Sequence, residues 1–181
     1  KKIFITGSTY GLGLIAAKLL MDQGHEVILH AKNQTRAHEV YNKLSSKYSG
    51  QFSMTIADLR SVLEIKSLVG QVNQHGKLDA IIHNAGLGLT ETPEYNEYGM
   101  TSLFSVNVFA PFYLSKYIVH PHHLIYLSSD LHRSGNFDLD DAQFKAKPWS
   151  ASKAYNDSKL YVTMMMKYFS RFYYDSIVTA V

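Results

Sequence analysis

Cysteine is absent from this chain of 181 residues. Its absence excludes disulfide bonds, thiolate catalysis and cysteine-based zinc sites, and it agrees with a reducing compartment. A long apolar run is missing as well, because no stretch approaches the roughly 20 apolar residues that a membrane-spanning helix needs. The first strand is expected to begin at Lys2, which leaves no room for a signal peptide before it. These absences predict a cytoplasmic protein without a membrane span.

Clusters of basic residues are also lacking. The formal net charge is +3, from 18 basic and 15 acidic residues, and no run of Lys or Arg indicates a nucleic-acid-binding protein. A mild basic excess suits an anionic small ligand equally well. The hydrophobic fraction of 46% and the charged fraction of 18% are typical of one compact globular domain, which we expect to span residues 1–181.

Short apolar runs and longer amphipathic segments alternate along the chain. This alternation is typical of β-α-β units, and it predicts an α/β fold in which a doubly wound parallel sheet has helices on both faces. Periodicity and turn residues predict strands at Lys2–Thr6, Glu26–His30, Phe52–Ile56, Leu78–His83, His123–Leu127 and Ser176–Val181. They predict helices at Leu12–Gln23, Gln34–Lys47, Val62–Gln74, Met100–Tyr117 and Ser152–Phe172.

A glycine-rich turn lies between the first expected strand and the first expected helix. Glycine permits a tight turn and lets the backbone come close to a pyrophosphate, whose charge the exposed N–H groups and the helix dipole attract. The alternative is three glycines that merely make a turn, but a position between strand and helix is the context that a dinucleotide-binding motif requires. The residues expected to bind the cofactor here are Gly7, Thr9, Tyr10, Gly11, Leu12 and Gly13.

The end of the second expected strand bears on which cofactor is bound. An NAD enzyme has an acidic residue there for the ribose 2′-hydroxyl, whereas this chain has His30-Ala31-Lys32-Asn33. The ammonium of Lys32 would attract the 2′-phosphate of NADP through charge-assisted hydrogen bonds. We therefore expect NADP(H) in preference to NAD(H), the alternative being that Lys32 is a solvated lysine at a helix start.

Two further segments are expected to border the cofactor. Asp58 and Leu59 follow the third strand, where the carboxylate of Asp58 is placed to accept a hydrogen bond from the adenine amino group, although Asp58 also suits a helix N-cap. Asn84, Ala85 and Gly86 follow the fourth strand, at the carboxyl edge of the sheet where ligands of open α/β folds lie. Larger side chains would crowd a cofactor there.

Tyr155 and Lys159 are four residues apart on an expected helix, so they share a face and lie one turn from each other. A neighbouring ammonium favours the phenolate form of a tyrosine, and the pair makes a usable proton donor and acceptor. Tyr155 is the only one of the 13 tyrosines that has a lysine four positions further on. Such a pair is also common as a simple contact on a helix surface, so the neighbouring residues decide its meaning.

Ser129 and Asn107 supply those neighbours. Ser129 stands at the end of the fifth strand, where its hydroxyl is placed to hydrogen-bond a carbonyl oxygen of a substrate. Asn107 lies in the helix before that strand and is placed to hold a water linking Lys159 to solvent. For Asn107 taken alone, a buried amide with satisfied hydrogen bonds is the favoured interpretation.

The order and approximate spacing of these motifs resemble those of the short-chain dehydrogenases/reductases of the Asn-Ser-Tyr-Lys tetrad type, over the whole chain. The resemblance implies Tyr155 as general acid/base, Lys159 as the cation that activates it and binds the nicotinamide ribose, Ser129 as carbonyl binder and Asn107 as support of the proton relay. It also implies a Rossmann-like sheet with strand order 3-2-1-4-5-6. Within the family, Leu127-Ser128-Ser129 and Ala154–Leu160 resemble the retinol dehydrogenase, WW-domain oxidoreductase and protochlorophyllide reductase branch. Protochlorophyllide is disfavoured as a substrate, because those reductases are thought to use a cysteine.

Three departures from the family pattern stand out. Ser129 and Tyr155 are 26 residues apart (155 minus 129), about twice the common spacing, although the long-loop branch has such an insertion. The segment Ile118–His123 is shorter than expected between a helix and a strand. The family continues with a Pro-Gly turn, a seventh strand and a substrate-covering region, so we expect the domain to be incomplete after Val181.

Other features have less specific interpretations. His120, His122 and His123 suggest a metal site, but no acidic partner lies nearby in sequence, so no metal is expected. The loop Asp130–Ser150 is expected to border the active site, with its acidic residues solvated. An apolar stretch around Met164–Met166 suits either core packing or the subunit contact that the resemblance implies, in a homodimer or homotetramer.

The sequence thus predicts an oxidoreductase that transfers a hydride between NADP(H) and an alcohol, aldehyde or ketone. Two alternatives stay open. One is a non-catalytic NADP(H)-binding sensor or scaffold on the same fold, since a fold does not determine function. The other is an epimerase or dehydratase acting on nucleotide sugars, which would share Tyr155 and Lys159 but usually has another glycine spacing and a large C-terminal domain.

Overall fold

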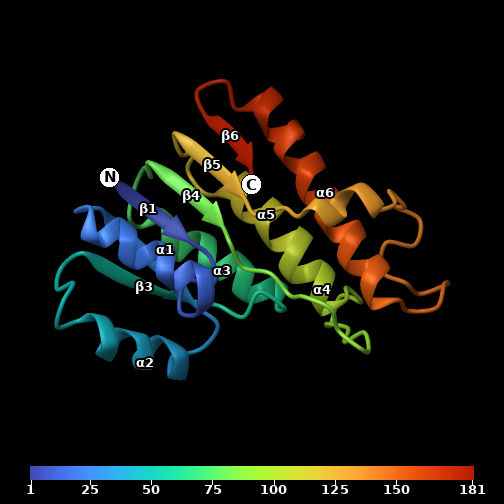
Figure 1. Cartoon of the computed structure of the whole chain (residues 1–181), viewed down its shortest axis with the longest axis horizontal. Coiled ribbons are helices and arrows are strands. Elements are labelled where there is room, and N and C mark those ends of the chain that lie inside the picture. The colour runs from blue at the N-terminus through green and yellow to red at the C-terminus, as the bar shows by residue number, and fades with distance from the viewer.

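The computed structural model describes all 181 residues and has a parallel six-stranded sheet at its centre (Figure 1). The strand order is β3-β2-β1-β4-β5-β6, and every neighbouring pair is parallel. The predicted fold class and strand order are therefore confirmed. The strands are β1 (Lys2–Ile5), β2 (Glu26–Ala31), β3 (Phe52–Ile56), β4 (Ala80–His83), β5 (His123–Tyr126) and β6 (Ile177–Ala180).

Helices cover both faces of this sheet because its strands are apolar on both sides. The alternation is visible in β1, where Ile3 and Ile5 pack with α1 and α2, while Phe4 faces the core beneath α3, α5 and α6. Figure 1 shows α6 lying beside β5 and β6. The main helices are α1 (Gly11–Asp22), α2 (Gln34–Leu44), α3 (Val62–Asn73), α5 (Ala110–Tyr117) and α6 (Ala151–Phe172). No helix is both long enough and apolar enough to cross a membrane.

Side-chain caps fix where the helices beside the expected cofactor cleft begin. Asn33 accepts a hydrogen bond from the backbone N–H of Arg36 at the start of α2, and Ser61 accepts one from Glu64 at the start of α3. The N-cap of α3 is thus Ser61 rather than Asp58. Asp58 lies three residues before this N-cap, and its carboxylate does not cap the helix.

The prediction of one continuous helix from Met100 to Tyr117 is wrong. The segment consists of a short turn, α4 (Ser102–Phe104), then the π-helix η1 (Ser105–Phe109), and then α5. Pro111 explains the interruption, because it has no N–H to donate to the carbonyl of Asn107 four residues back, and its ring crowds that carbonyl. The backbone N–H of Ala110 instead reaches the carbonyl of Ser105, five residues back.

The other predicted boundaries lie within three residues of those observed. The 3-10 helix η2 (Asp130–Ser134), at the start of the loop that joins β5 to α6, was not predicted. Ser129 forms its N-cap and accepts a hydrogen bond from the backbone N–H of Leu131 at 3.3 Å. The loop therefore starts as an ordered turn packed against α6.

Candidate active site

The glycine turn between β1 and α1 is held in shape from behind. Gly7 and Gly11 have φ angles of 65° and 54°, in the left-handed region that favours glycine. The side-chain amide of Asn84 donates to the carbonyl oxygens of Thr6 and Gly7, at 2.9 and 3.1 Å. The backbone N–H of Ala85 donates to Thr6 Oγ1 at 3.0 Å. The loops after β1 and β4 are thereby joined.

Gly13 is required for a different reason, which is close approach. A Cβ atom added at Gly13 would lie 2.4 Å from Asn84 Nδ2 and 2.5 Å from the carbonyl oxygen of Gly7. No ordinary contact is that short, so α1 approaches the turn only because this position has no side chain. The third glycine of the motif thus sets the packing of helix on turn, as it does in dinucleotide-binding folds generally.

A Gly13→Ala variant is expected to lower the free energy of unfolding by about 1–3 kcal/mol, the usual cost of overpacking a tight contact. The added methyl would displace the Asn84 amide or the Gly7 carbonyl. Urea unfolding followed by circular dichroism measures the change. Gly70→Ala on α3 is the matched control: nothing lies within 4 Å of its added Cβ, so it is expected to be neutral or stabilising by up to about 1 kcal/mol. Equal effects of the two variants would contradict this account.

A cleft of about 460 Å³ opens in front of the glycine turn, within the size range of small-molecule sites. Residues after β1, β2, β3 and β4 line it, so it lies at the carboxyl edge of the sheet, where open α/β folds bind ligands. The predicted cofactor residues that line this cleft are Gly7, Thr9, Tyr10, Gly11, Leu12, Lys32, Asp58, Leu59, Asn84, Ala85 and Gly86. Gly13 packs behind the turn and does not line it.

Charged side chains gather at one end of this cleft. The carboxylate of Asp58 accepts hydrogen bonds from the backbone and guanidinium of Arg60, the shortest at 2.7 Å, and lies 3.8 Å from the ammonium of Lys32. Burial acts to raise the pKa of Asp58, but the bonds from Arg60 outweigh it and the pKa lies below its ordinary value. Arg36, in the first turn of α2, also lines this end.

Sequence reasoning missed Arg36 and Arg60, and it also missed the role of His30. The signal for Arg36 was a cation three residues after the N-cap Asn33, on the turn that follows Lys32. His30 Nδ1 accepts the N–H of Gly7 at 3.0 Å, so Nε2 carries the proton and donates to the carbonyl of Ala57 at 2.9 Å. Burial lowers the pKa of His30 to about 4, so an uncharged imidazole braces the turn.

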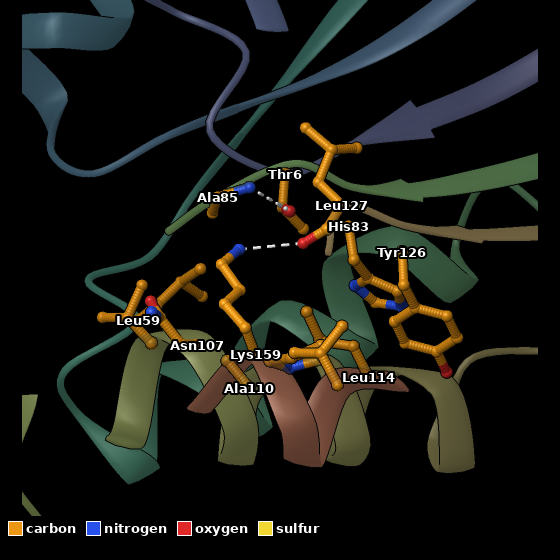
Figure 2. Close-up of a pocket in the computed structure, with 13 residues that line it drawn as sticks. Thr6, Leu59, His83, Ala85, Asn107, Ala110, Leu114, Tyr126, Leu127 and Lys159 are labelled. Atoms are coloured by element: carbon orange, nitrogen blue, oxygen red, sulfur yellow. Dashed lines mark hydrogen bonds between the residues drawn. The ribbon is translucent and has the colours of Figure 1, made fainter. Parts of the chain in front are cut away.

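Lys159 lies close to the cleft without being one of its lining residues. Its ammonium donates to the carbonyl of Leu127 at 2.8 Å and lies 5.6 Å from the ring centroid of Tyr155 (Figure 2 shows the bond to Leu127). Burial lowers the pKa of Lys159. A Cβ added at Gly86, which lines the cleft, would be 3.9 Å from the Lys159 nitrogen. The cleft and the ammonium are therefore in direct reach of each other.

Asn107 sits next to Lys159 on the π-helix η1. Its Oδ1 accepts from the backbone N–H of Leu87 at 2.7 Å, and its Nδ2 donates to the carbonyl of Leu87 and to Ser158 Oγ, at 3.0 and 3.1 Å. The side-chain amide thus joins the loop after β4 to α6. Both hydrogens of Nδ2 are used, so only the second lone pair of Oδ1 is left for a water.

Ser129 and Tyr155 lie further out. Neither lines the cleft, nor a second, smaller cavity that Lys159 lines behind it. Ser129 Oγ is the N-cap of η2. Tyr155 is partly buried and packs against a small cluster of Leu103, Phe144 and Ala154. The strand that leads to Ser129 is fixed to α6 by a 2.8 Å hydrogen bond between Ser128 and Thr163. The structure thus brings Lys159, Asn107 and Tyr155 together. Ser129 is two residues further along the chain than Leu127, whose carbonyl accepts the hydrogen bond from Lys159.

The remaining sequence features have structural partners. His120 stacks on Tyr173 and His123 bonds Thr179, and no group of three acidic or histidine side chains gathers as metal ligands do. In the loop after Ser129, Asp138 pairs with Lys147 at 2.8 Å, so this part of the acidic run is not simply solvated. In the apolar stretch of α6, Tyr161, Met165 and Phe169 are buried in the core, whereas Met164 is exposed.

Comparison with known proteins gives the geometry a context. The family model described as short chain dehydrogenase matches residues 1–131. The short-chain dehydrogenase chyC of Penicillium rubens is 39% identical over 183 aligned positions, which cover 99% of this chain and 69% of that protein. Human retinol dehydrogenase 13 is 26% identical, over 99% of this chain and 56% of its own length. A match to a retinol dehydrogenase agrees with the branch that the motifs resemble.

Solved structures show the same fold. A short-chain dehydrogenase from Sphingobium yanoikuyae, in complex with NADPH, superposes with a TM-score of 0.76 at 17% sequence identity, over 99% of this chain and 69% of that one. At this identity the likeness concerns the fold alone. The identity and coverage of the curated relatives, together with the family model, are what carry the assignment to a family.

Proposed function

Because this chain belongs to the short-chain dehydrogenase family, we propose that it is an oxidoreductase that uses NADP(H) and acts on a small alcohol, aldehyde or ketone. The observation that carries the proposal is the position of Lys159 next to the cleft in front of the glycine turn. A Cβ added at Gly86, which lines that cleft, would lie 3.9 Å from the ammonium, and the ammonium lies 5.6 Å from the ring centroid of Tyr155. A dinucleotide needs both ends of such a cleft, one for its phosphates and one for its reactive ring.

The residues present fit that cofactor. The N–H groups of Gly7 and Ser8 are used by His30, but the first turn of α1 has no side-chain cap, so its backbone N–H groups are left for a pyrophosphate. His30 behind the turn is uncharged, and Lys32 and Arg36 add positive charge at the far end. When bound, the nicotinamide supplies or accepts the hydride.

The protein's part is to move one proton and to stabilise charge. In carbonyl reduction, Tyr155 gives its hydroxyl proton to the substrate oxygen, and in alcohol oxidation it takes that proton back. The buried ammonium of Lys159 stabilises the phenolate that forms when the proton leaves. Ser129 donates a hydrogen bond to the substrate oxygen. Asn107 fixes α6 against the loop after β4, and this contact holds Lys159 in its position next to the cleft.

The 2′-phosphate of NADP would be held by Lys32 and Arg36. Lys32 is exposed and only loosely paired with Asp58, at 3.8 Å, because Arg60 supplies the short bonds to that carboxylate. Its ammonium is therefore available to a second anion. Arg36 contributes a guanidinium from the adjacent helix turn, and its partner Glu39 is half exposed.

A Lys32→Ala variant is expected to bind NADPH about ten-fold to a hundred-fold more weakly, with NADH affinity unchanged, because a charge-assisted hydrogen bond to phosphate is lost. Arg36→Ala is expected to act in the same direction. Fluorescence titration with both cofactors measures the effect, and Lys43→Ala at the far end of α2 is the matched control. Equal affinities of the parent protein for NADH and NADPH would overturn the preference for NADP.

The proposed activity is tested by titrating the protein with NADPH and following NADPH oxidation over a panel of aldehydes and ketones. Turnover with at least one carbonyl compound is the expected result. Cofactor binding without turnover of any substrate, in either direction, would instead favour a non-catalytic sensor. That alternative would leave unexplained why a lysine is buried beside a tyrosine at the end of the cleft.

We also propose that two copies of the chain associate through α5 and α6, as the family resemblance implies. The outer surfaces of these helices carry exposed aromatic residues, namely Tyr117, Tyr168 and Phe172. Rows of exposed aromatic side chains are enriched where proteins meet.

A further inference from the structure

A second, much smaller cavity lies behind the cleft. It measures about 10 Å³, close to the least volume that admits one water molecule. It shares Leu59, Ala85, Val106 and Leu127 with the cleft. The side chains with polar atoms that line it are Thr6, His83, Asn107, Tyr126 and Lys159 (Figure 2). A cavity lined by several polar groups is of the kind that holds an ordered water rather than staying empty.

His83 is a polar residue of this lining that the proposed function leaves without a role. Its side chain is buried, and its ring is stacked on Tyr126 with centroids 4.9 Å apart. Nε2 lies 2.9 Å from Ser115 Oγ, which in turn lies 2.6 Å from the hydroxyl of Tyr126. Nδ1 has no hydrogen-bond partner at all. A buried nitrogen without a partner is costly, so a missing partner is to be looked for.

The hydrogen-bond chain determines what that partner has to be. Tyr126 has no second partner for its hydroxyl, so its hydrogen is used only if Tyr126 donates to Ser115. Ser115 then donates to His83 Nε2, and the ring proton resides on Nδ1. In Figure 2 the His83 ring lies between Tyr126 on one side and the Lys159 chain on the other. Nδ1–H therefore needs an acceptor on the cavity side.

We propose that the cavity holds one tightly bound water, which accepts a hydrogen bond from His83 Nδ1 and another from the Lys159 ammonium. The ammonium has three N–H donors, and the structure gives it one partner, the carbonyl of Leu127. The water is left with two hydrogens, and Thr6 Oγ1 in the same lining offers one acceptor. His83 is then a positioning residue for Lys159.

The charges around His83 support a fixed rather than a titrating role. The titratable groups that face it are Tyr126 on β5, against its ring, and Lys159 on α6, across the cavity, while α5 and β1 present only the hydroxyls of Ser115 and Thr6. Burial lowers the pKa of His83 to about 3 and raises that of Tyr126. The chain from Tyr126 to Nδ1 therefore keeps its protons over the working pH range and acts as a constant dipole.

The consequence concerns catalysis and rests on the proposed function. Lys159 is desolvated, and a water polarised by His83 replaces part of the hydration that burial removes. This water holds the ammonium in place beside Tyr155. Without it, the ammonium would move more freely and would stabilise the phenolate less well.

The water itself is tested by a crystal structure of the protein at a resolution that orders single waters, with and without NADPH. The expected result is one water within hydrogen-bond distance of His83 Nδ1 and Lys159 Nζ. An empty cavity in the parent protein would overturn the proposal. This measurement needs no turnover, so it stands even if the proposed enzymatic activity fails.

The positioning role is tested with two variants that both place an uncharged amide at the buried position of His83. His83→Asn keeps an N–H donor near the position of Nδ1, whereas His83→Gln moves its amide toward Nε2 and leaves the cavity side empty. The expected kcat of the Gln variant is about ten-fold below that of the Asn variant, with KM and NADPH affinity alike. The pH at half-maximal alcohol oxidation is expected to rise by about half a unit in the Gln variant alone. Equal kcat values and equal pH profiles for the two variants would overturn this role.

Discussion

A Tyr155→Phe variant is expected to lose about 10²–10⁴-fold in kcat for NADPH oxidation while binding NADPH as the parent does. The loss is of the size that a well-placed general acid contributes, because phenylalanine keeps the ring against Leu103, Phe144 and Ala154 but has no proton to give. Stopped-flow or steady-state kinetics on a carbonyl compound accepted by the parent gives kcat, and fluorescence titration gives the affinity for the cofactor.

A matched control for this variant is Tyr174→Phe, because Tyr174 lies just beyond α6 and is 87% exposed. It is expected to leave kcat unchanged. Lys159→Met is expected to lower kcat as well and, unlike Tyr155→Phe, also to weaken NADPH binding, since its ammonium reaches the cleft beside Gly86. Turnover by the Phe variant at the parent rate would remove Tyr155 from the mechanism.

Acid is expected to destabilise the protein by about 4 kcal/mol between pH 7 and pH 5, through His30 and His83. Burial lowers their pKa values from 6.5 to about 4 and about 3, so the folded state keeps both rings neutral at pH 5. The unfolded state binds a proton on each below pH 6.5. Each histidine therefore costs about 1.4 kcal/mol of stability per pH unit from 6.5 down to its folded pKa, and the loss grows as the pH falls. Urea unfolding at a series of pH values measures it.

Variants separate the two contributions. His83→Asn and His30→Gln are each expected to remove about half of the pH dependence, whatever they do to the stability at pH 7. His38→Asn, at an exposed position of α2, is expected to leave the slope unchanged. A stability that stays flat from pH 7 to pH 5 in the parent protein would contradict the burial of neutral imidazoles.

Periodicity alone was enough to locate the strands and the covering helices, because strands such as β1 are apolar on both faces and helices such as α3 have an apolar residue every three or four positions. The strand order came from the family resemblance. Periodicity was not enough for the segment before β5. There Pro111 shifts the hydrogen-bond pattern into a π-helix, and the apolar pattern of residues 102–117 did not reveal this single turn. The 3-10 helix η2 was missed because it is set by a single cap at Ser129.

The site was predictable where one residue type has one function. Gly7, Gly11, Asn84 and Gly86 line the cleft, which lies at the carboxyl edge of the sheet where these residue types were expected. Residues that act through a partner far away in sequence were not predictable. His30 was noted only for what it is not, an acidic residue, and nothing in its neighbourhood pointed to a bond with Gly7.

The same limit applied to His83, which the sequence placed only at the end of the fourth expected strand. Its contacts with Ser115 and Tyr126 join three elements whose order in the chain does not suggest that they touch. Packing in three dimensions decides which polar residues are buried together, and a single sequence does not contain that information.

The amide of Asn84 joins two loops that are 78 residues apart, and Gly13 allows α1 to close against both of them. The surface that receives a dinucleotide is consequently assembled during folding. A ligand that binds there has to order little of the protein backbone. Its affinity is therefore reduced little by an ordering cost and depends mainly on the contacts that it makes. Loss of the Asn84 hydrogen bonds would weaken the binding of every ligand of the cleft to the same extent, whichever substrate the protein transforms.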